Sequence, residues 1–589
     1  MTVRFLFGFL SEEKRMTQLK QEFGWKIPPK NKEFLLDCVK TICKKLKSNS
    51  PLWNEVFNFF YELQDDSFLK NSLEDVILLN FVCQSVWDFI ILAYCIQHCN
   101  SLKVLEVDRP DFLYFKSPVK QFKYCDERVV QKYVDLLFKG LISVGNLRKL
   151  SISTWSLNES GCRHLAEFLR KNHKLRELCL PWCNISDNGL KLLCEELKHP
   201  DCELEVLQLS WETLTVSSSR HLADVLRKKQ RLVELHLSFH NCVTHERREE
   251  AFQLLCEGLK DPDCKLDTLR IPELMLTLSC YRQLAEVLWE NQRLRELDLT
   301  QYHQKGEDIK LLSEGLKHSD CKLETLTLSA DHLRESPCKY LAEVLKENQS
   351  LKKLYLKATV VHDKGMELLF EALKGPCCKL EKLWLSKAFF STSFCQCLAD
   401  ILRENQVLKE LALISLHITD KEMEELCEVL KHPNCKLEKF GIFNTHLRES
   451  WCRYLAEVLK ENQTLRQLAL HQCHGGSQEM ELLCEELKHP NCKLEKVWIP
   501  AVSLTESCCR HLAQVFKENQ NLRELDLFHC DIGDREKELL YEGLKHPACK
   551  LEKLLVNEKC VVLNHREKAS TGITERIFSF IRKVFRMNK

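Results

Sequence analysis

Four stretches of the chain, LKKLYL (351–356), LEKLWL (380–385), LKELAL (408–413) and LEKFGI (437–442), repeat one pattern at a nearly fixed distance. Apolar residues occupy the first, fourth and sixth positions, and the residues between them vary. Side chains of a β-strand point alternately to its two faces, so the fourth and sixth positions share one face. The pattern therefore predicts a short strand with one buried, apolar face and one variable, outward face.

The same pattern, with Ile, Val or Phe sometimes replacing a leucine, runs through most of the chain. It begins at Leu102, Leu147, Leu175, Leu204, Leu232, Leu266, Leu294, Leu323, Leu351, Leu380, Leu408, Leu437, Leu465, Leu494, Leu522 and Leu551. From Leu266 onward the steps alternate strictly between 28 and 29 residues, so the true period is a pair of units. Two steps are longer: 45 residues follow Leu102, and 34 follow Leu232, with the additional residues near 241–250. Self-similarity at this period predicts a leucine-rich-repeat solenoid.

Each strand is followed by a segment with apolar residues at helical spacing, as in Leu190, Leu193 and Leu197. Residues that can cap a first helical turn precede such segments, for example Ser186, Thr419 and Thr505. Helices of one unit type end in Lys-His-Pro, as at 198–200. Those of the other type end in Glu-Asn-Gln, as at 347–349, where the asparagine is predicted to adopt the left-handed conformation.

Each unit is therefore a strand, a turn and a helix, and no single unit can bury its leucines alone. Stacked units place the strands on an inner curve and the wider helices on an outer curve. We predict an α/β fold, a horseshoe solenoid of alternating 28/29-residue leucine-rich repeats preceded by a small all-α domain. The predicted domains are a helical domain over 1–100, the repeats over 101–560, and a basic amphipathic tail over 561–589.

The composition favours a soluble protein without a nucleic-acid partner. The 589 residues carry 86 Lys and Arg against 85 Asp and Glu, so the basic footprint of a nucleic-acid-binding protein is absent. Residues 1–10 do not form a convincing signal peptide, and the longest apolar run, 86–96, contains Asp88 and is too short to span a bilayer. We predict a cytoplasmic protein whose 32 cysteines are reduced thiols.

The sequence offers no catalytic, cofactor or metal residues. None of the 17 glycines is followed by lysine, so no phosphate-binding loop exists and ATP binding is not expected. The segment His245-Glu246-Arg247-Arg248-Glu249 lacks the second histidine of a zinc-protease motif, and its arginines are predicted to lie in a solvated loop. We therefore predict that the protein is not an enzyme.

The cysteines recur at equivalent repeat positions, where a small, weakly polar side chain suits a packed core. No paired C-x-x-C arrangement typical of a zinc site is present. Cys95, His98 and Cys99 fall within about one helical turn but lack a fourth ligand, so helix packing is the favoured interpretation.

Large aromatic residues at outward strand positions are the candidate protein-binding residues. Trp182, Trp211 and Phe239 share a position just after the leucine pattern in three successive units. Tyr355, Trp384 and Trp498 share the central strand position, the first two in adjacent units. Trp and Tyr are enriched at binding hot spots, and an exposed aromatic strip usually marks an interaction site. The alternative is that these rings pack on the stems of neighbouring side chains.

The tail from Thr574 to Lys589 places apolar residues on one helical face and basic residues beside them. A cap over the last repeat is the favoured interpretation. The alternative is a helix that contacts a membrane surface or a partner.

Several motifs resemble known families. LLCEELKHPNCKLE (482–495) and ESCCRHLA (506–513) resemble the ribonuclease-inhibitor subtype of leucine-rich repeats. FLFGFLSEEKR (5–15), FYELQDDSF (60–68) and YCIQHCNSL (94–102) resemble, in order, three segments of the pyrin-containing NOD-like receptors, from the winged-helix junction through the second helical domain to the first repeat. No segment of these 589 residues resembles the pyrin or NACHT domain of that family, so we expect a truncated receptor, the product of a decayed gene, or a part of a longer chain.

The resemblance implies a truncated receptor-type scaffold that binds a protein on the concave repeat face, in innate immune sensing or its regulation. A ribonuclease-inhibitor-like binder is one alternative, although that family is strongly acidic and this chain is close to neutral. A Ran-type GTPase activator is another, although that family ends in an acidic tail and this chain ends in a basic one.

Overall fold

A computed structural model describes most of the chain between residues 29 and 562. Residues 1–28, 109–134 and 563–589 lie outside the described part, together with short segments at 47–49, 51, 84, 154–155, 182, 212–214, 229–230, 240–244, 273, 301–305, 334, 362, 387–391, 415–417, 444–447, 472–476, 499–503, 528–529, 531 and 557–558. The chain divides into two compact units, Met1–Asp298 and Leu299–Lys589, here called unit 1 and unit 2.

Unit 1 begins with helices and continues as repeats. Its helices are α3 (Pro29–Lys45), α4 (Leu52–Leu63), α5 (Asp66–Leu73), α6 (Val86–Ile96), α8 (Glu159–Lys171), α9 (Asp187–Leu197), α10 (Val216–Lys228), α11 (His245–Lys260) and α12 (Leu278–Glu290). Its main strands are β1 (Leu78–Val82), β2 (Val104–Asp108), β3 (Lys149–Ile152), β5 (Glu177–Leu180), β7 (Val206–Trp211), β8 (Glu234–Phe239), β9 (Thr268–Arg270) and β10 (Glu296–Leu299). A separate short pair joins β4 (Ser156–Leu157) to β6 (Asn184–Ile185).

Unit 2 consists of repeats throughout its described part. Its strands are β11 (Thr325–Leu333), β12 (Lys353–Val361), β13 (Lys382–Ser386), β14 (Glu410–Ile414), β15 (Lys439–Phe443), β16 (Gln467–His471), β17 (Lys496–Trp498), β18 (Glu524–Leu527), β19 (Lys553–Val556) and β20 (Lys559–Val562). Its helices are α13 (Gly306–Lys317), α14 (Glu335–Glu347), α15 (Asp363–Lys374), α16 (Thr392–Glu404), α17 (Asp420–Lys431), α18 (Glu449–Glu461), α19 (Ser477–Glu486), α20 (Glu506–Glu518) and α21 (Asp534–Leu544).

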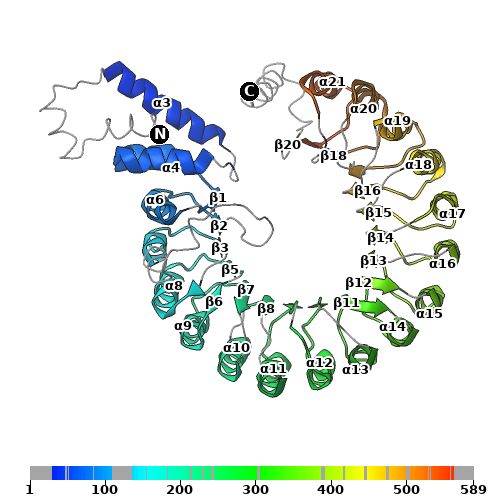
Figure 1. Ribbon diagram of the computed structural model, residues 1–589, viewed down its shortest axis with the longest axis horizontal. Coiled ribbons are helices and arrows are strands. Elements are labelled where there is room, and N and C mark those ends of the chain that lie inside the picture. Colours follow the sequence, from blue (N-terminus) through cyan, green and yellow to red (C-terminus); the bar gives the residue numbers. More distant parts are fainter. Residues whose placement is uncertain are drawn as a thin grey trace, which may run out of the picture. The chain divides into compact units, whose positions relative to one another are not determined.

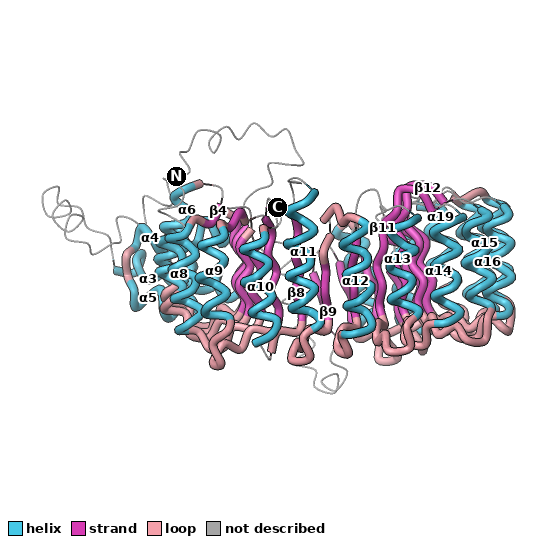
Figure 2. The backbone as a smooth tube through the Cα atoms, turned by 90° about the horizontal axis from the view of Figure 1, so that it is seen from below, coloured by secondary structure: helices cyan, strands magenta, loops and turns pink. Residues whose placement is uncertain are grey.

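In the repeats of each unit, the strands line the inner side of a curved stack and the helices cover the outer side (Figure 1). Figure 2 shows helices of successive repeats side by side, with the strands behind them. Neighbouring strands pair in parallel, and the residue partners are one repeat apart, as in Leu354↔Leu383 and Leu383↔Leu411. The exception is β20, which pairs antiparallel with β19. The predicted leucine-rich-repeat solenoid is confirmed.

The leucines of the strand pattern form the core of both units. Leu207 and Leu235 in unit 1, and Leu383 and Leu411 in unit 2, are at most 1 % exposed. Burying such side chains contributes roughly 1.5–3 kcal/mol each relative to leaving them in water. Because every repeat adds the same contribution, the core fixes the fold and leaves the outward strand positions variable.

The predicted helix starts are confirmed. The side chain of Ser186 accepts a hydrogen bond from the Gly189 amide at 3.2 Å. Thr419 and Glu422 form a reciprocal capping box at the start of α17. Each cap satisfies an amide that the first helical turn would otherwise leave unpaired.

The predicted left-handed asparagine at the helix ends is wrong. The described residues contain one non-glycine residue with positive φ, Gln64. Asn348 is instead buried, and its Nδ2 donates to the carbonyl of Leu316, 32 residues earlier, at 2.6 Å. Its Oδ1 accepts from the amides of Ser350 and Leu351 at 2.8 and 2.7 Å. The asparagine therefore bridges neighbouring repeats, and its backbone needs no unusual conformation.

Two further details differ from the sequence prediction. The strand β1 lies within the segment predicted to be helical, because the buried Leu79 and Phe81 continue the alternation and β1 pairs in parallel with β2. Arg248 was predicted to lie in a solvated loop. It lies in α11, only 7 % exposed, because its Nη1 donates to the Met275 carbonyl at 2.6 Å.

The described cysteines are present as thiols, and nearly all are buried. Burial raises the pKa of the Cys194 and Cys338 thiols to about 12, so these groups are protonated and unreactive at neutral pH. This environment agrees with the predicted role of the recurring cysteines in core packing.

Candidate partner-binding surface on the strands of unit 2

The outward side chains of the strands form a surface, here called the strand face. In β13 they are Lys382, Trp384 and Ser386, which alternate with the buried Leu383 and Leu385. Parallel pairing aligns equivalent positions of successive strands. The central row of unit 2 reads Thr327, Tyr355, Trp384, Ala412, Gly441, Ala469, Trp498, Asp526 and Leu555.

The structure describes three of the six predicted binding residues fully. Tyr355 and Trp384 are register partners, and Trp498 lies in the same row, three strands beyond Ala412. All three aromatic side chains are partly exposed. The prediction that Tyr355 and Trp384 lie side by side is confirmed.

The other predicted cluster belongs to unit 1. The backbones of Trp211 and Phe239 are register partners at the ends of β7 and β8. The side chains of both residues, and the whole of Trp182, lie outside the described part. Their role in binding therefore stays a prediction.

Contacts on two sides hold the Trp384 ring. It meets Tyr355 edge to face, with ring centroids 5.1 Å apart. On the other side it lies roughly parallel to Phe443, at 6.2 Å and 29°. Its Nε1 donates to Glu410 Oε1 at 2.9 Å. A ring held in this way loses little conformational entropy when a partner packs on it.

Glu410 connects the aromatic residues to a charged row. Its Oε2 lies 2.9 Å from Lys382 Nζ and 3.7 Å from Lys439 Nζ. Burial opposes ionisation of this carboxyl, but the hydrogen bonds from Lys382 and Trp384 and the nearby lysine charges outweigh burial and lower its pKa. The carboxylate therefore stays ionised at neutral pH and keeps its bond to the indole.

A trough lies between the two tryptophans. Its floor is made by the smallest residues of the central row, Ala412, Gly441 and Ala469. Trp384 and Trp498 stand on either side, and Phe443 lies over Gly441, where an added Cβ would approach its ring to 2.5 Å. The trough is open to solvent and has a volume of about 260 Å³.

Phe443, Glu410 and the small residues were not predicted as part of the site. Three successive repeats carry a small residue at the central strand position, between repeats that carry tryptophan there. This pattern is visible in the sequence and could have indicated the trough. The position of the Phe443 ring could not, because it depends on the conformation of that side chain.

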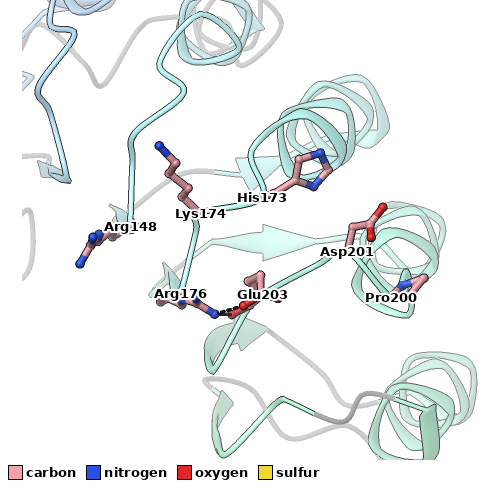
Figure 3. A pocket seen from close by; sticks show the side chains of 7 residues that line it. All are labelled: Arg148, His173, Lys174, Arg176, Pro200, Asp201 and Glu203. Atoms are coloured by element: carbon pink, nitrogen blue, oxygen red, sulfur yellow. Dashed lines mark hydrogen bonds and ion pairs between the residues drawn. The ribbon is translucent and has the colours of Figure 1, made fainter.

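A second hollow, of about 670 Å³, lies in unit 1 at the loops that lead into the strands (Figure 3). Arg148, His173, Lys174 and Arg176 line it together with Pro200, Asp201 and Glu203. Figure 3 shows Arg176 paired with Glu203, and Arg231 also pairs with Glu203. Because carboxylates offset the cations, this hollow is a mixed-charge surface and not a site selective for anions.

The described residues contain no group of three or more His, Cys, Asp or Glu arranged to hold a metal ion. Cys95 and Cys99 are buried, and each donates a hydrogen bond to a backbone carbonyl, those of Phe57 and Cys95. His98 packs against Tyr94 and lies 3.4 Å from Asp66 Oδ1. The arrangement is that of helix packing.

The described helices include none that is long and apolar enough to cross a bilayer.

Comparison with known proteins supports the resemblance noted in the sequence. The family model of the NLRC4 helical domain HD2 matches residues 1–71. A Leucine Rich repeat model matches residues 171–194 and 518–535. The solved TLR13–ssRNA13 complex is similar at a TM-score of 0.40 and 18% identity, over 83% of this chain and 67% of that one. The family assignment rests on the sequence relatives alone.

Human NACHT, LRR and PYD domains-containing protein 14 is 29% identical over 555 residues, which cover 93% of this chain and 47% of the relative. Protein 12 of the same series from Mus musculus is 31% identical and covers 87% and 47%. The chain thus spans about half the length of these relatives. Ribonuclease inhibitor of Mus musculus is 36% identical over 392 residues, which cover 66% of this chain and 85% of the inhibitor. The chain belongs to the ribonuclease-inhibitor-like leucine-rich-repeat family, and its similarity to the NACHT, LRR and PYD domains-containing proteins begins in a helical domain and continues through the repeats.

Proposed function

We propose that this chain is a non-enzymatic, cytoplasmic scaffold that binds another protein on the strand face of unit 2. Its role would lie in innate immune sensing or the regulation of that process, as the NACHT, LRR and PYD relatives suggest. The observation that carries the proposal is Trp384. This large ring is partly exposed, yet Tyr355, Phe443 and Glu410 hold it in one position. Preorganised aromatic residues of this kind dominate the affinity of protein interfaces.

The alternative is that these rings pack as part of the core. The leucines on the opposite side of the same strands already fill the core and are almost fully buried. Trp384 and Trp498 face away from them and line the trough. Removal of either ring should therefore reduce binding more than it reduces stability.

The test begins with the identification of proteins that the purified chain retains from a cytoplasmic extract. The dissociation constants of these proteins are then measured for the parent chain and for the variants Trp384→Ala and Trp498→Ala. The matched control is Gln208→Ala, at the central row of unit 1. We expect each tryptophan variant to bind about 30-fold more weakly, equivalent to about 2 kcal/mol, with a melting temperature close to that of the parent. Unchanged binding by both variants would contradict the proposal.

A second candidate is inhibition of a ribonuclease. The observation that favours it is the match to ribonuclease inhibitor over 85% of that protein, together with the acidic outward positions of unit 1, which include Glu106, Glu177 and Glu234. A ribonuclease activity assay with increasing amounts of the purified chain tests it directly. Stoichiometric inhibition would favour this candidate, and full activity at a large excess of the chain would dismiss it.

A further inference from the structure

The trough in unit 2 has a size and a charge that define what can occupy it. Its volume of about 260 Å³ lies below the range of roughly 300–1,000 Å³ that is usual for small-molecule and cofactor sites. Most of its lining is carbon, from the small floor residues and the aromatic walls, and Glu410, Lys439 and Gln467 also line it. A cavity of this size and lining suits one large apolar side chain.

Contacts within the sheet hold the Trp384 and Phe443 side of the trough in place. Glycine at 441 lets the Phe443 ring lie against the strand, since any larger residue would collide with it. Phe443 in turn supports Trp384, which is also bonded to Glu410. The cavity is therefore present before a ligand arrives and does not require rearrangement of the sheet.

The charges around the trough are predominantly positive. Among the described outward positions of β12 to β19 there are six lysines and three acidic residues, namely Lys353, Lys357, Lys382, Lys439, Lys496 and Lys553 against Glu410, Glu524 and Asp526. Glu410 and Glu524 are already bound to lysines, at 2.9 Å from Lys382 and 3.0 Å from Lys496. The remaining potential favours an acidic ligand.

We propose that the trough takes one aromatic side chain from an acidic segment of a partner protein. This inference rests on the proposed function and specifies the partner's chemistry. The ring would insert between Phe443 and Trp498, over Gly441 and Ala469, and the flanking carboxylates would face the lysines of the strand face. Aromatic burial supplies the affinity, and charge complementarity supplies orientation and the rate of association.

The probe is a synthetic peptide with one Trp between four acidic residues on each side. Two matched peptides replace the Trp with Ala or the acidic residues with Lys. Fluorescence anisotropy measures their binding to the full chain. We expect the Trp acidic peptide to bind at least tenfold more tightly than either matched peptide, with an affinity that falls as salt rises.

Ala469→Trp fills the trough from its floor, and Ala469 is partly exposed, so the added ring can project outward without entering the core. We expect this variant to bind the Trp peptide at least tenfold more weakly. Gln208→Trp is the control, with the same side chain at the equivalent position of unit 1.

Absence of peptide binding at concentrations up to about 1 mM, or equal binding to the Ala469→Trp variant, would overturn the inference. The proposed function has a separate readout in the natural partner. If Trp384→Ala abolishes binding of the natural partner but Ala469→Trp leaves that binding unchanged, the scaffold function stands. The trough is then not the place where the partner is anchored.

Discussion

The strand faces of the two units lie over equivalent leucine cores, but their outward side chains differ in charge and in size. In unit 1 the described outward positions hold six acidic residues, Glu106, Asp108, Glu177, Glu234, Glu296 and Asp298, and two basic ones, Lys149 and Arg270. In unit 2 the corresponding positions hold more lysines than acidic residues, and an aromatic trough interrupts them.

The two basic residues of this set in unit 1 each lie between two carboxylates. Lys149 Nζ lies 3.0 and 3.7 Å from carboxylate oxygens of Glu106 and Glu177. Arg270 Nη2 lies 2.8 Å from Glu296 and 3.6 Å from Glu234. Each cation therefore bridges two strands. The comparison teaches that the repeat fixes the position of every outward side chain, while the identity of that side chain decides the charge and the shape that the face offers to a partner.

If the leucine core is common to both units, its loss should have the same effect in each. Leu207→Ala in unit 1 and Leu383→Ala in unit 2 remove side chains that are at most 1 % exposed, at equivalent strand positions. We expect each to destabilise the protein by about 3 kcal/mol, because the transfer energy is lost and a cavity remains. Chemical denaturation of both variants measures this loss of stability. If the two units unfold in separate transitions, the transition that shifts identifies the unit in which each mutation acts. A change below about 1 kcal/mol in either would contradict the common core.

The buried asparagines should also be equivalent in the two units. Asn291 donates to the Leu259 carbonyl at 2.6 Å in unit 1, and Asn405 donates to the Leu373 carbonyl at 2.5 Å in unit 2. Replacement by alanine leaves that carbonyl and two loop amides without their partner inside the protein, and we expect a loss of about 2 kcal/mol in each case. Denaturant titration of Asn291→Ala and Asn405→Ala measures it. Gln292→Ala, an exposed neighbour, is the control. Full stability of either asparagine variant would show that water replaces the lost bonds.

These two kinds of residue show how far sequence reasoning reaches. The leucine period predicted the fold because the strands of successive repeats obey the same local rule, and the regular steps placed Tyr355 beside Trp384. The role of the asparagines was missed because a helix-end rule considers only nearby residues. The carbonyl that Asn405 binds lies 32 residues earlier in the chain.

The binding surface shows the same limit. Trp384 and Trp498 could be chosen from the sequence because large rings at outward positions are unusual. Glu410 could not be chosen in this way, because it lies in a different row from Trp384 on the neighbouring strand, and only the structure shows the hydrogen bond between the two side chains. Phe443 is two residues beyond Gly441, and only side-chain conformation brings its ring back over the trough.

Charge reversal on unit 2 would make its strand face resemble that of unit 1. Lys353 and Lys357 both lie on β12, and Lys357 is exposed. We expect the double change to Glu to weaken binding of the acidic Trp peptide by about tenfold at low salt, because long-range attraction becomes repulsion, and by less at high salt. Fluorescence anisotropy at several salt concentrations measures this. Lys339→Glu on the exposed surface of α14 is the control, and an equal effect there would attribute the loss to net charge alone.

The smallest expected effect concerns Glu410 of unit 2, the carboxylate that accepts a hydrogen bond from the Trp384 indole. Burial disfavours the charged form of Glu410, yet bonds from Lys382 and Trp384 hold its pKa below the ordinary value of 4.5. A carboxyl whose pKa is lowered by folding stabilises the protein above its unfolded pKa and loses that contribution as pH falls through the folded pKa. The parent should therefore be more stable than Glu410→Gln at pH 7, and the difference should shrink only below about pH 4.5. We expect it to stay under about 1 kcal/mol, because the ion pair is partly exposed. Melting temperatures of the two proteins across this pH range measure the difference. A difference that is constant with pH would mean that the carboxylate charge plays no part in holding Trp384, and that packing against Tyr355 and Phe443 suffices to fix the ring.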